Sequence, residues 1–253
     1  MNDPLASLKP PVLAAFYRRL ADHADRNRGE LTISLAALFM RRWLDNRDAR
    51  STFIVEPPPH LRNHRRVLDA LSFHRRVYLT QERARLTGGI AKWAGVVPRV
   101  IGQSPFQRWD GKGPLMMDYE SLVEIPLRYQ VTGDDADRDL LHSLHGFQLK
   151  TSVIMTGTPP QGRGKWRIAV HSFEAETRDR YDFDYAEHLT LPNPDSGSEA
   201  PGAVAPTSAK IIVYHRHAKR VEDAGLAAPY DVRSKRWRIT DPRLLGHAER
   251  PRP

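Results

Sequence analysis

The chain has 253 residues, a net charge of +9 at pH 7 and no cysteine. The lack of cysteine excludes disulfides, thiolate metal sites and thiol nucleophiles together. The longest apolar run, LTISLAALFM at residues 31–40, is about half of the ~20 residues that a membrane-spanning helix needs, so it predicts a buried helix instead. The composition, 40% hydrophobic and 27% charged, is ordinary for a globular protein, and the length allows two modest domains.

The excess of basic over acidic residues lies entirely in the first half of the chain. Residues 1–118 contain 20 basic and 11 acidic residues, whereas residues 119–253 contain 19 of each. A basic half attracts nucleic acid, an anionic lipid surface or an acidic partner, and the sign of the charge alone does not choose among them.

The N-terminal part has the spacing of helices. Between residues 11 and 101 apolar residues recur three and four positions apart, which predicts three or four helices. The prolines of EPPPH, residues 56–60, interrupt this pattern, and TGG at residues 87–89 indicates a further break. The sequence HRRV occurs at residues 64–67 and 74–77 and is interpreted as a solvated basic face.

From about residue 119 the apolar period changes to two, which is typical of strands with one solvated face. We expect strands at residues 124–131, 147–155, 166–178, 210–216 and 229–242, and a flexible loop rich in Pro, Gly and Ser at residues 191–209. The predicted fold class is therefore α+β: a basic helical region at residues 1–118, followed by an antiparallel, β-rich, half-barrel-like domain at residues 119–253.

The stretch TRDRYDFDYAEHLT, residues 177–190, begins at the end of the third of these segments and contains most of the candidate chemistry. Strand alternation places Asp179 and Tyr181 on the same face as Phe173, which is apolar. Because an unpaired carboxylate is costly to bury, Asp179 is expected at a rim or in a cleft. The alternative is an ordinary strand end with solvated aspartates.

The spacing of Asp179, Tyr181, Asp182 and His188 resembles the signature of the colicin M family, which is Asp, any residue, Tyr, Asp, five residues, His, Arg. The preceding LHGFQLKTSVIMTG also resembles the strand before that signature, so the similarity covers roughly residues 140–190. One position departs from the pattern, because Leu189 stands where the family has arginine. The residues considered as a substitute cation, and as substrate-binding groups, are Arg178, Arg180, Arg216 and Lys219.

The resemblance implies an enzyme that hydrolyses lipid II, the peptidoglycan precursor, at its pyrophosphate linkage. It implies that Asp179 and Asp182 hold Mg²⁺, since hard carboxylate oxygens suit this ion. His188 would serve as general base or acid, and Tyr181 would bind a phosphate oxygen or orient an aspartate.

The N-terminus has no recognisable secretory signal, so the expected protein is a secreted toxin made in the cytoplasm and delivered by a type VI-like apparatus to act in the periplasm of a target bacterium. Its expected partners are an immunity protein, a carrier or adaptor of the apparatus, and the anionic inner-membrane surface.

Two alternative functions fit the same sequence. A metal-dependent nuclease would use the aspartates for magnesium and the basic half for DNA, although nucleic acid is the less favoured partner. A non-enzymatic adaptor of a secretion system would use the acidic cluster as a binding surface. Three other pairs are interpreted as structural: His215 with His217 on a basic strand end, His142 with His145 at a turn lining the cleft, and Trp166 with Trp237 as hydrophobic anchors.

Overall fold

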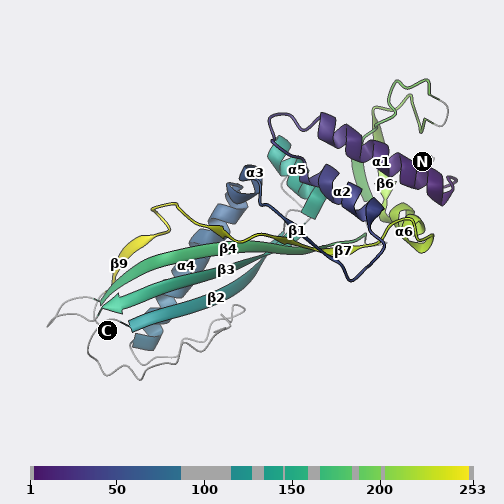
Figure 1. The fold of residues 1–253 in the computed structure, drawn as a ribbon. Coiled ribbons are helices and arrows are strands. Elements are labelled where there is room, and N and C mark those ends of the chain that lie inside the picture. The colour runs from purple at the N-terminus through teal and green to yellow at the C-terminus, as the bar shows by residue number, and fades with distance from the viewer. Residues whose placement is uncertain are drawn as a thin grey trace. The chain divides into compact units, whose positions relative to one another are not determined.

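The structure is a computed structural model that describes residues 3–86, 115–126, 134–144, 146–158, 166–183, 188–200 and 203–250. It contains helices and strands, with helices first along the chain, so the α+β prediction is confirmed (Figure 1). The helices are α1 (Pro10–Arg26), α2 (Leu35–Asp45), α3 (Pro59–Arg62), α4 (Arg65–Leu86), α5 (Asp135–Leu144) and α6 (His215–Asp223). The strands are β1 (Thr52–Val55), β2 (Leu115–Pro126), β3 (Gly146–Thr158), β4 (Trp166–Tyr181), β5 (His188–Pro192), β6 (Lys210–Tyr214), β7 (Tyr230–Ser234), β8 (Trp237–Arg238) and β9 (Gly246–Arg250).

The strands pair in the order β1-β7-β4-β3-β2, with β8 and β9 also paired with β4, while β5 and β6 form a separate antiparallel sheet. The chain divides into two compact units, each built from three segments. Unit 1 comprises residues 1–60, 126–146 and 179–233, and unit 2 comprises residues 61–125, 147–178 and 234–253. This division differs from the predicted boundary at residue 118, which lies inside β2.

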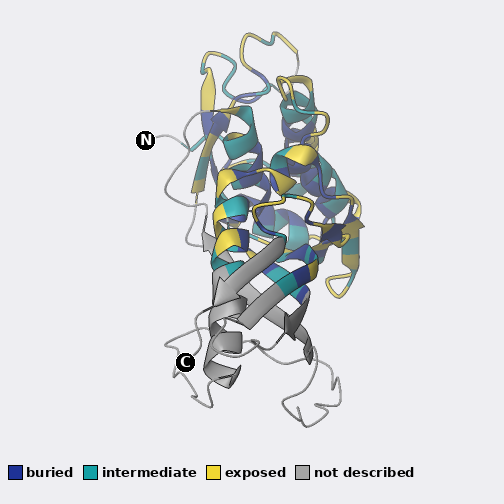
Figure 2. Ribbon diagram, turned by 90° about the vertical axis from the view of Figure 1, so that its left-hand side faces the viewer, coloured by how far each residue is buried: buried dark blue, intermediate teal, exposed yellow. Residues whose placement is uncertain are grey.

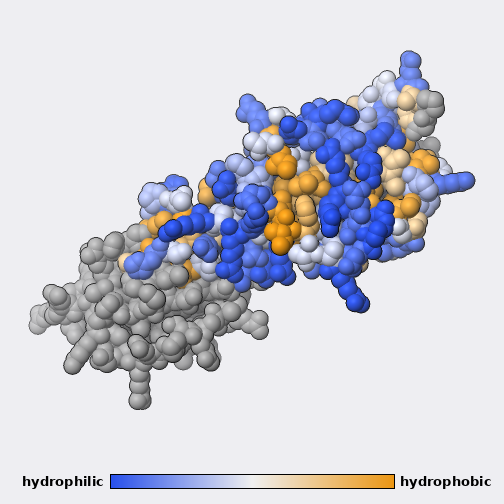
Figure 3. Space-filling view, viewed as in Figure 1, coloured by the Kyte–Doolittle hydropathy of each residue, from blue (hydrophilic) through white to orange (hydrophobic). Residues whose placement is uncertain are grey.

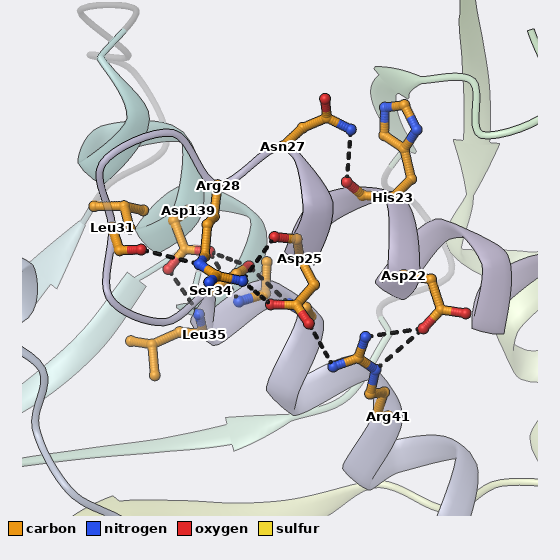
Figure 4. Close-up of polar contacts among 12 residues, drawn as sticks. Asp22, His23, Asp25, Asn27, Arg28, Leu31, Ser34, Leu35, Arg41 and Asp139 are labelled. Atoms are coloured by element: carbon orange, nitrogen blue, oxygen red, sulfur yellow. Dashed lines mark hydrogen bonds and ion pairs between the residues drawn. The ribbon is translucent and has the colours of Figure 1, made fainter.

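Unit 1 contains four of the helices and the β5–β6 hairpin. Proline at the start of α1 fits the first helical turn, where a missing N–H is tolerated, and Ser34 caps α2 by accepting a hydrogen bond from Ala37 N at 3.1 Å. Helix α1 packs against α2 and α6, and α2 packs against α5. Arg41 of α2 joins the α1 carboxylates of Asp22 and Asp25, at 2.9 and 3.1 Å (Figure 4).

The centre of unit 1 is aromatic. Rings from α1, α2, β1, the end of β4 and β7 lie within about the 4.5–7 Å typical of favourable aromatic pairs. These residues are Tyr17, Phe39, Trp43, Phe53, Tyr181, Phe183 and Tyr230. The Tyr230 hydroxyl also donates to the Phe39 carbonyl at 2.8 Å, so the one polar atom of this buried ring is satisfied. Burial is concentrated on the facing sides of the helices, as the dark blue segments of Figure 2 show.

Unit 2 is organised by the β3–β4 hairpin. The two strands pair antiparallel from Gln148 opposite Arg178 to Thr158 opposite Arg167, with an irregularity at Ile154/Met155. The predicted alternation is confirmed on β3, where the side chains of Phe147, Leu149, Thr151 and Val153 are buried. Helix α4 contacts this hairpin through His74, whose Nδ1 lies 2.6 Å from Thr151 Oγ1.

Several local predictions need correction. Residues 215–216 begin α6 rather than ending a strand, so His215 and His217 are buried helix residues. His64, His74 and Val67 of the repeated HRRV are buried, so this sequence is not simply a solvated face.

Two further predictions concern regions described only in part. In the segment 191–209, Asn193 is buried and its side chain donates to the carbonyls of Val204, Ala205 and Ser208, so the described part is held by hydrogen bonds. Residues 87–89, 127–131 and His145 lie outside the described residues.

On the face seen in Figure 3, the described surface is mainly hydrophilic, with smaller apolar areas. The large hydrophobic residues exposed on it are Val12, Ile33 and Ile54. No helix among the described residues is both long and apolar enough to span a bilayer.

Candidate functional site

The candidate site begins at the end of β4, where the predicted alternation delivers Asp179 and Tyr181. Phe173, Ala175 and Thr177 are buried along the same face, so this face leads from a packed core to the carboxyl of Asp179. Asp179 is half-buried, and burial, together with the neighbouring charge of Asp182, raises its pKa to about 8. A hydrogen bond involving the Arg180 backbone opposes this shift only in part. The neutral form of Asp179 is therefore favoured at neutral pH when no cation is nearby.

The side chain of Tyr181 is buried, whereas a catalytic phenol is expected to be accessible to the substrate. The ring of Tyr181 stacks on Tyr230 with centroids 5.5 Å apart, and it meets Phe39 and Phe183 edge-on. Burial also raises the pKa of its hydroxyl, which disfavours the phenolate. The residue thus anchors the end of β4 in the aromatic core of unit 1.

Asp182 lies on the solvent side of the chain. It is exposed, and its carboxylate is 3.6 Å from Arg180 Nε. Arg180 also pairs with Asp231 at 2.9 Å and donates to the Ala49 carbonyl at 3.3 Å. Asp182 therefore remains accessible, while Arg180 is shared between two carboxylates.

His188 is the first residue of β5 and is exposed. It pairs with Tyr214 in the β5–β6 ladder, and their ring centroids are 5.5 Å apart. The guanidinium of Arg216 lies over the ring of Tyr214, 4.0 Å from its centroid. Arg216 also forms an ion pair with Asp3 at 2.7 Å. Tyr214 therefore links the histidine to a cation.

The other predicted cations are engaged elsewhere. Arg178 pairs with Glu176 at 2.7 Å, and Lys219 pairs with Glu222 and Asp223 on its own helix. Among the described residues, Arg216 alone of the four residues considered as substitutes for the arginine absent at Leu189 is connected to His188, through the ring of Tyr214.

A cavity of about 480 Å³ lies in unit 1, beside the candidate segment. Tyr181, Phe183 and Leu189 line it from the segment itself, and α1, α2, α5 and the β5–β6 hairpin complete its walls. Its volume is within the range of about 300–1,000 Å³ that is typical of small-molecule sites. His142, predicted to lie at a turn lining the cleft, belongs instead to helix α5, and it is among the lining residues of the cavity.

One wall of the cavity is fixed by Asp139, a residue that sequence reasoning did not select. Its buried carboxylate accepts from Ser34 Oγ at 2.6 Å and from the backbone N–H groups of Leu35 and Ala36 at 2.8 and 3.1 Å (Figure 4). His60 Nε2 lies 3.1 Å from the same carboxylate. Ser34 before an apolar helix was a recognisable capping signal, but nothing local in the sequence indicated a carboxylate from α5, about a hundred residues away.

No group of three or more potential metal ligands occurs among the described residues. Comparison with known proteins found no matching family model, no similar curated protein and no similar solved structure.

Proposed function

We propose that the chain is an antibacterial toxin that hydrolyses the undecaprenyl-pyrophosphate linkage of lipid II and so blocks cell-wall synthesis. The observation that carries the proposal is the pair of carboxyls at the end of β4, one half-buried with a pKa raised to about 8 and one exposed. The electrostatic coupling of Asp179 with Asp182 and the environment of His188 support a polar reaction centre at the segment that resembles the colicin M signature.

The two carboxyls fit a magnesium ion by donor chemistry. Both offer hard oxygens, and Asp182 destabilises the charged form of Asp179, a repulsion that a bound cation relieves. Magnesium often binds one or two carboxylates and completes its coordination with waters and substrate phosphates, so two protein ligands suffice. The ion, when bound, neutralises charge on the pyrophosphate oxygens.

The remaining roles belong to side chains of this chain. His188, exposed at the start of β5, activates water or protonates the leaving oxygen. Arg216, held over the ring of Tyr214, compensates phosphate charge in place of the arginine absent at Leu189. Tyr181 positions the two aspartates by fixing the end of β4 in the aromatic core.

The proposal includes a route and partners. The toxin is made in the cytoplasm, is exported by a type VI-like apparatus with a carrier or adaptor, and acts in the periplasm of a target cell. The basic residues of the region 1–118 favour the anionic inner-membrane surface, where lipid II resides. The producing cell is protected by a cognate immunity protein.

The direct test is incubation of the purified protein with lipid II and Mg²⁺, followed by mass spectrometry of the products. We expect cleavage at the pyrophosphate linkage, lost on chelation with EDTA and restored by Mg²⁺. Asp179→Asn and His188→Ala should each lower the rate about 100-fold or more, because each removes a group that acts on the reacting phosphate.

Asp223→Asn is the matched control, since Asp223 is an exposed carboxyl of unit 1 that pairs with Lys219. It should leave the rate unchanged, and circular dichroism should show that all three variants are folded. Intact lipid II with the wild-type protein, or full activity of both Asp179→Asn and His188→Ala, would refute the proposal.

A further inference from the structure

The cavity of unit 1 combines an apolar interior with cationic groups. Apolar side chains come from α1, the loop before α2, α2, α5 and β5. They include Leu20, Ala24, Leu31, Met40, Leu141 and Leu191. Basic side chains also line the cavity: His23, Arg28, Arg138, His142 and Lys210. A site with this composition suits a ligand that has both an apolar body and an anionic group.

The acidic residues of the cavity are already compensated. The carboxylate of Asp139 accepts hydrogen bonds from Ser34 and from two backbone N–H groups of α2, and it also contacts His60. Asp135 pairs with Arg138. These two carboxylates therefore do not leave the cavity with uncompensated negative charge that would repel an anion.

Lys210 is the cation best placed to meet a ligand. It is exposed at the start of β6, opposite Pro192 of β5, and both residues line the cavity. Within the described part of the chain Lys210 forms no ion pair, whereas Arg28 pairs with Asp25 and Arg138 pairs with Asp135. An ammonium group without an acidic partner can bind a phosphate without first breaking an existing pair.

Two residues that line the cavity are neighbours in the sequence of residues in the proposed reaction centre. Tyr181 lies between Asp179 and Asp182 in the sequence, and Leu189 follows His188 directly. Both Tyr181 and Leu189 line the cavity. The apolar part of a substrate held here would thus lie beside the residues that carry the candidate chemistry.

We propose that this cavity binds the apolar chain of a lipid-linked phosphate, with Lys210 contacting the phosphate end. The inference rests on the proposed function, because it names the part of lipid II that unit 1 holds. It also makes a prediction that is independent of catalysis: the protein binds a short isoprenoid phosphate without cleaving it.

The test is isothermal titration of the full chain with farnesyl monophosphate, in the presence of EDTA, with inorganic phosphate and farnesol as separate arms. We expect farnesyl monophosphate to bind more tightly than either fragment, because it alone satisfies the apolar walls and the cation. Lys210→Ala should weaken the binding of farnesyl monophosphate about tenfold and leave the binding of farnesol unchanged. Lys9→Ala, at an exposed lysine before α1, should have no effect.

Two substitutions fill the cavity from different walls. Ala24→Phe acts from α1, and Thr190→Trp acts from β5 at an exposed position where a large side chain is easily accommodated in the folded protein. Each should weaken the binding of farnesyl monophosphate about tenfold or more, because the new side chain excludes the apolar chain of the ligand. Ala15→Phe, on the exposed side of α1, is the matched control and should bind as the wild type does.

The outcomes separate this inference from the proposed function. Binding of farnesyl monophosphate that is lost in the cavity variants supports the inference even when lipid II stays intact. Lipid II cleavage at the wild-type rate by a folded Ala24→Phe and a folded Thr190→Trp supports the function and overturns the cavity assignment. The inference is also overturned when farnesyl monophosphate fails to bind, or when inorganic phosphate binds equally tightly.

Discussion

At the scale of single residues, Tyr214 connects two features that the sequence separates. Its ring contacts His188 of the neighbouring strand and lies under the guanidinium of Arg216, the second residue of α6. Stacking of a guanidinium on a tyrosine holds its charge in place while leaving N–H groups free to bind an anion. Asp3 fixes the same guanidinium from another side.

This arrangement predicts that Arg216 contributes to hydrolysis of lipid II. Arg216→Ala should lower kcat about tenfold or more with a smaller effect on the free energy of unfolding, because it removes a cation near the proposed reaction centre. Lys219→Ala is the matched control, since Lys219 pairs within α6. Asp3→Asn should retain most of the activity, because it weakens the ion pair but keeps the charge of Arg216. Equal rates for Arg216→Ala and Lys219→Ala would contradict the role.

His74 provides a prediction about stability and pH. Burial lowers its pKa from 6.5 to about 4, so the folded protein binds this proton less readily than the unfolded chain. Its contribution to stability is complete above pH 6.5 and is lost as the pH falls toward 4. We expect this group to reduce the free energy of unfolding by about 2–3 kcal/mol over that interval.

Urea unfolding at several pH values measures the effect of His74. His74→Leu keeps an apolar group in the same place but removes the titration, so its stability should fall less steeply between pH 6.5 and 4. The overall stability of His74→Leu will also change, because the contact with Thr151 Oγ1 is lost. Parallel pH profiles for the variant and the wild type would show that His74 is not responsible.

At the scale of elements, strand alternation was the most informative signal in the sequence. It predicted the apolar faces of β3 and β4, and it predicted that Asp179 leaves the core on the face of Phe173, although Glu176 on the opposite face of β4 is buried as well. Alternation is reliable here because a slip of one residue would expose the whole apolar set.

The sequence was less informative where a strand changes into a helix. KIIVYHR has the composition of a strand, but the pattern gives no indication that β6 ends at Tyr214 and that α6 begins at His215. His217 is buried and contacts Asp3 at 3.0 Å, a partner from the other end of the chain. Such long-range contacts decide the local structure and leave no local signature.

The contact between Asp139 of α5 and the start of α2 is the second example of a long-range contact. Its contribution to the free energy of unfolding can be measured. Asp139→Ala removes the acceptor for Ser34 Oγ and for two N–H groups at the start of α2, all of them buried. We expect a loss of about 2–4 kcal/mol in the free energy of unfolding, measured in urea. Asp45→Asn, which weakens the exposed pair with Arg18, should cost under about 1 kcal/mol. Similar losses in the two variants would argue against a bracing role for Asp139.

At the scale of the whole molecule, the organisation differs most from what the sequence indicated. A change of apolar period near residue 119 separates a helical from a β-rich region, yet each compact unit takes segments from both. Unit 1 brings α1 and α2 together with residues 179–233, so Tyr181 at the end of β4 packs against a helix from the basic region. The cavity has the same mixed origin, and no linear division of the chain could have predicted it.

The function of the whole molecule can be tested by where it is toxic. Expression with a cleavable export signal should lyse susceptible bacteria, because lipid II hydrolysis would then occur at the outer side of the inner membrane, whereas cytoplasmic expression should be tolerated. Asp179→Asn, exported to the same level, should be harmless, and co-expression of an exported immunity protein should restore growth. Toxicity confined to the cytoplasm would instead support a nuclease that uses the basic residues 1–118 for DNA, and its DNA affinity should then fall steeply with salt. Growth unaffected by expression in either compartment would support an adaptor.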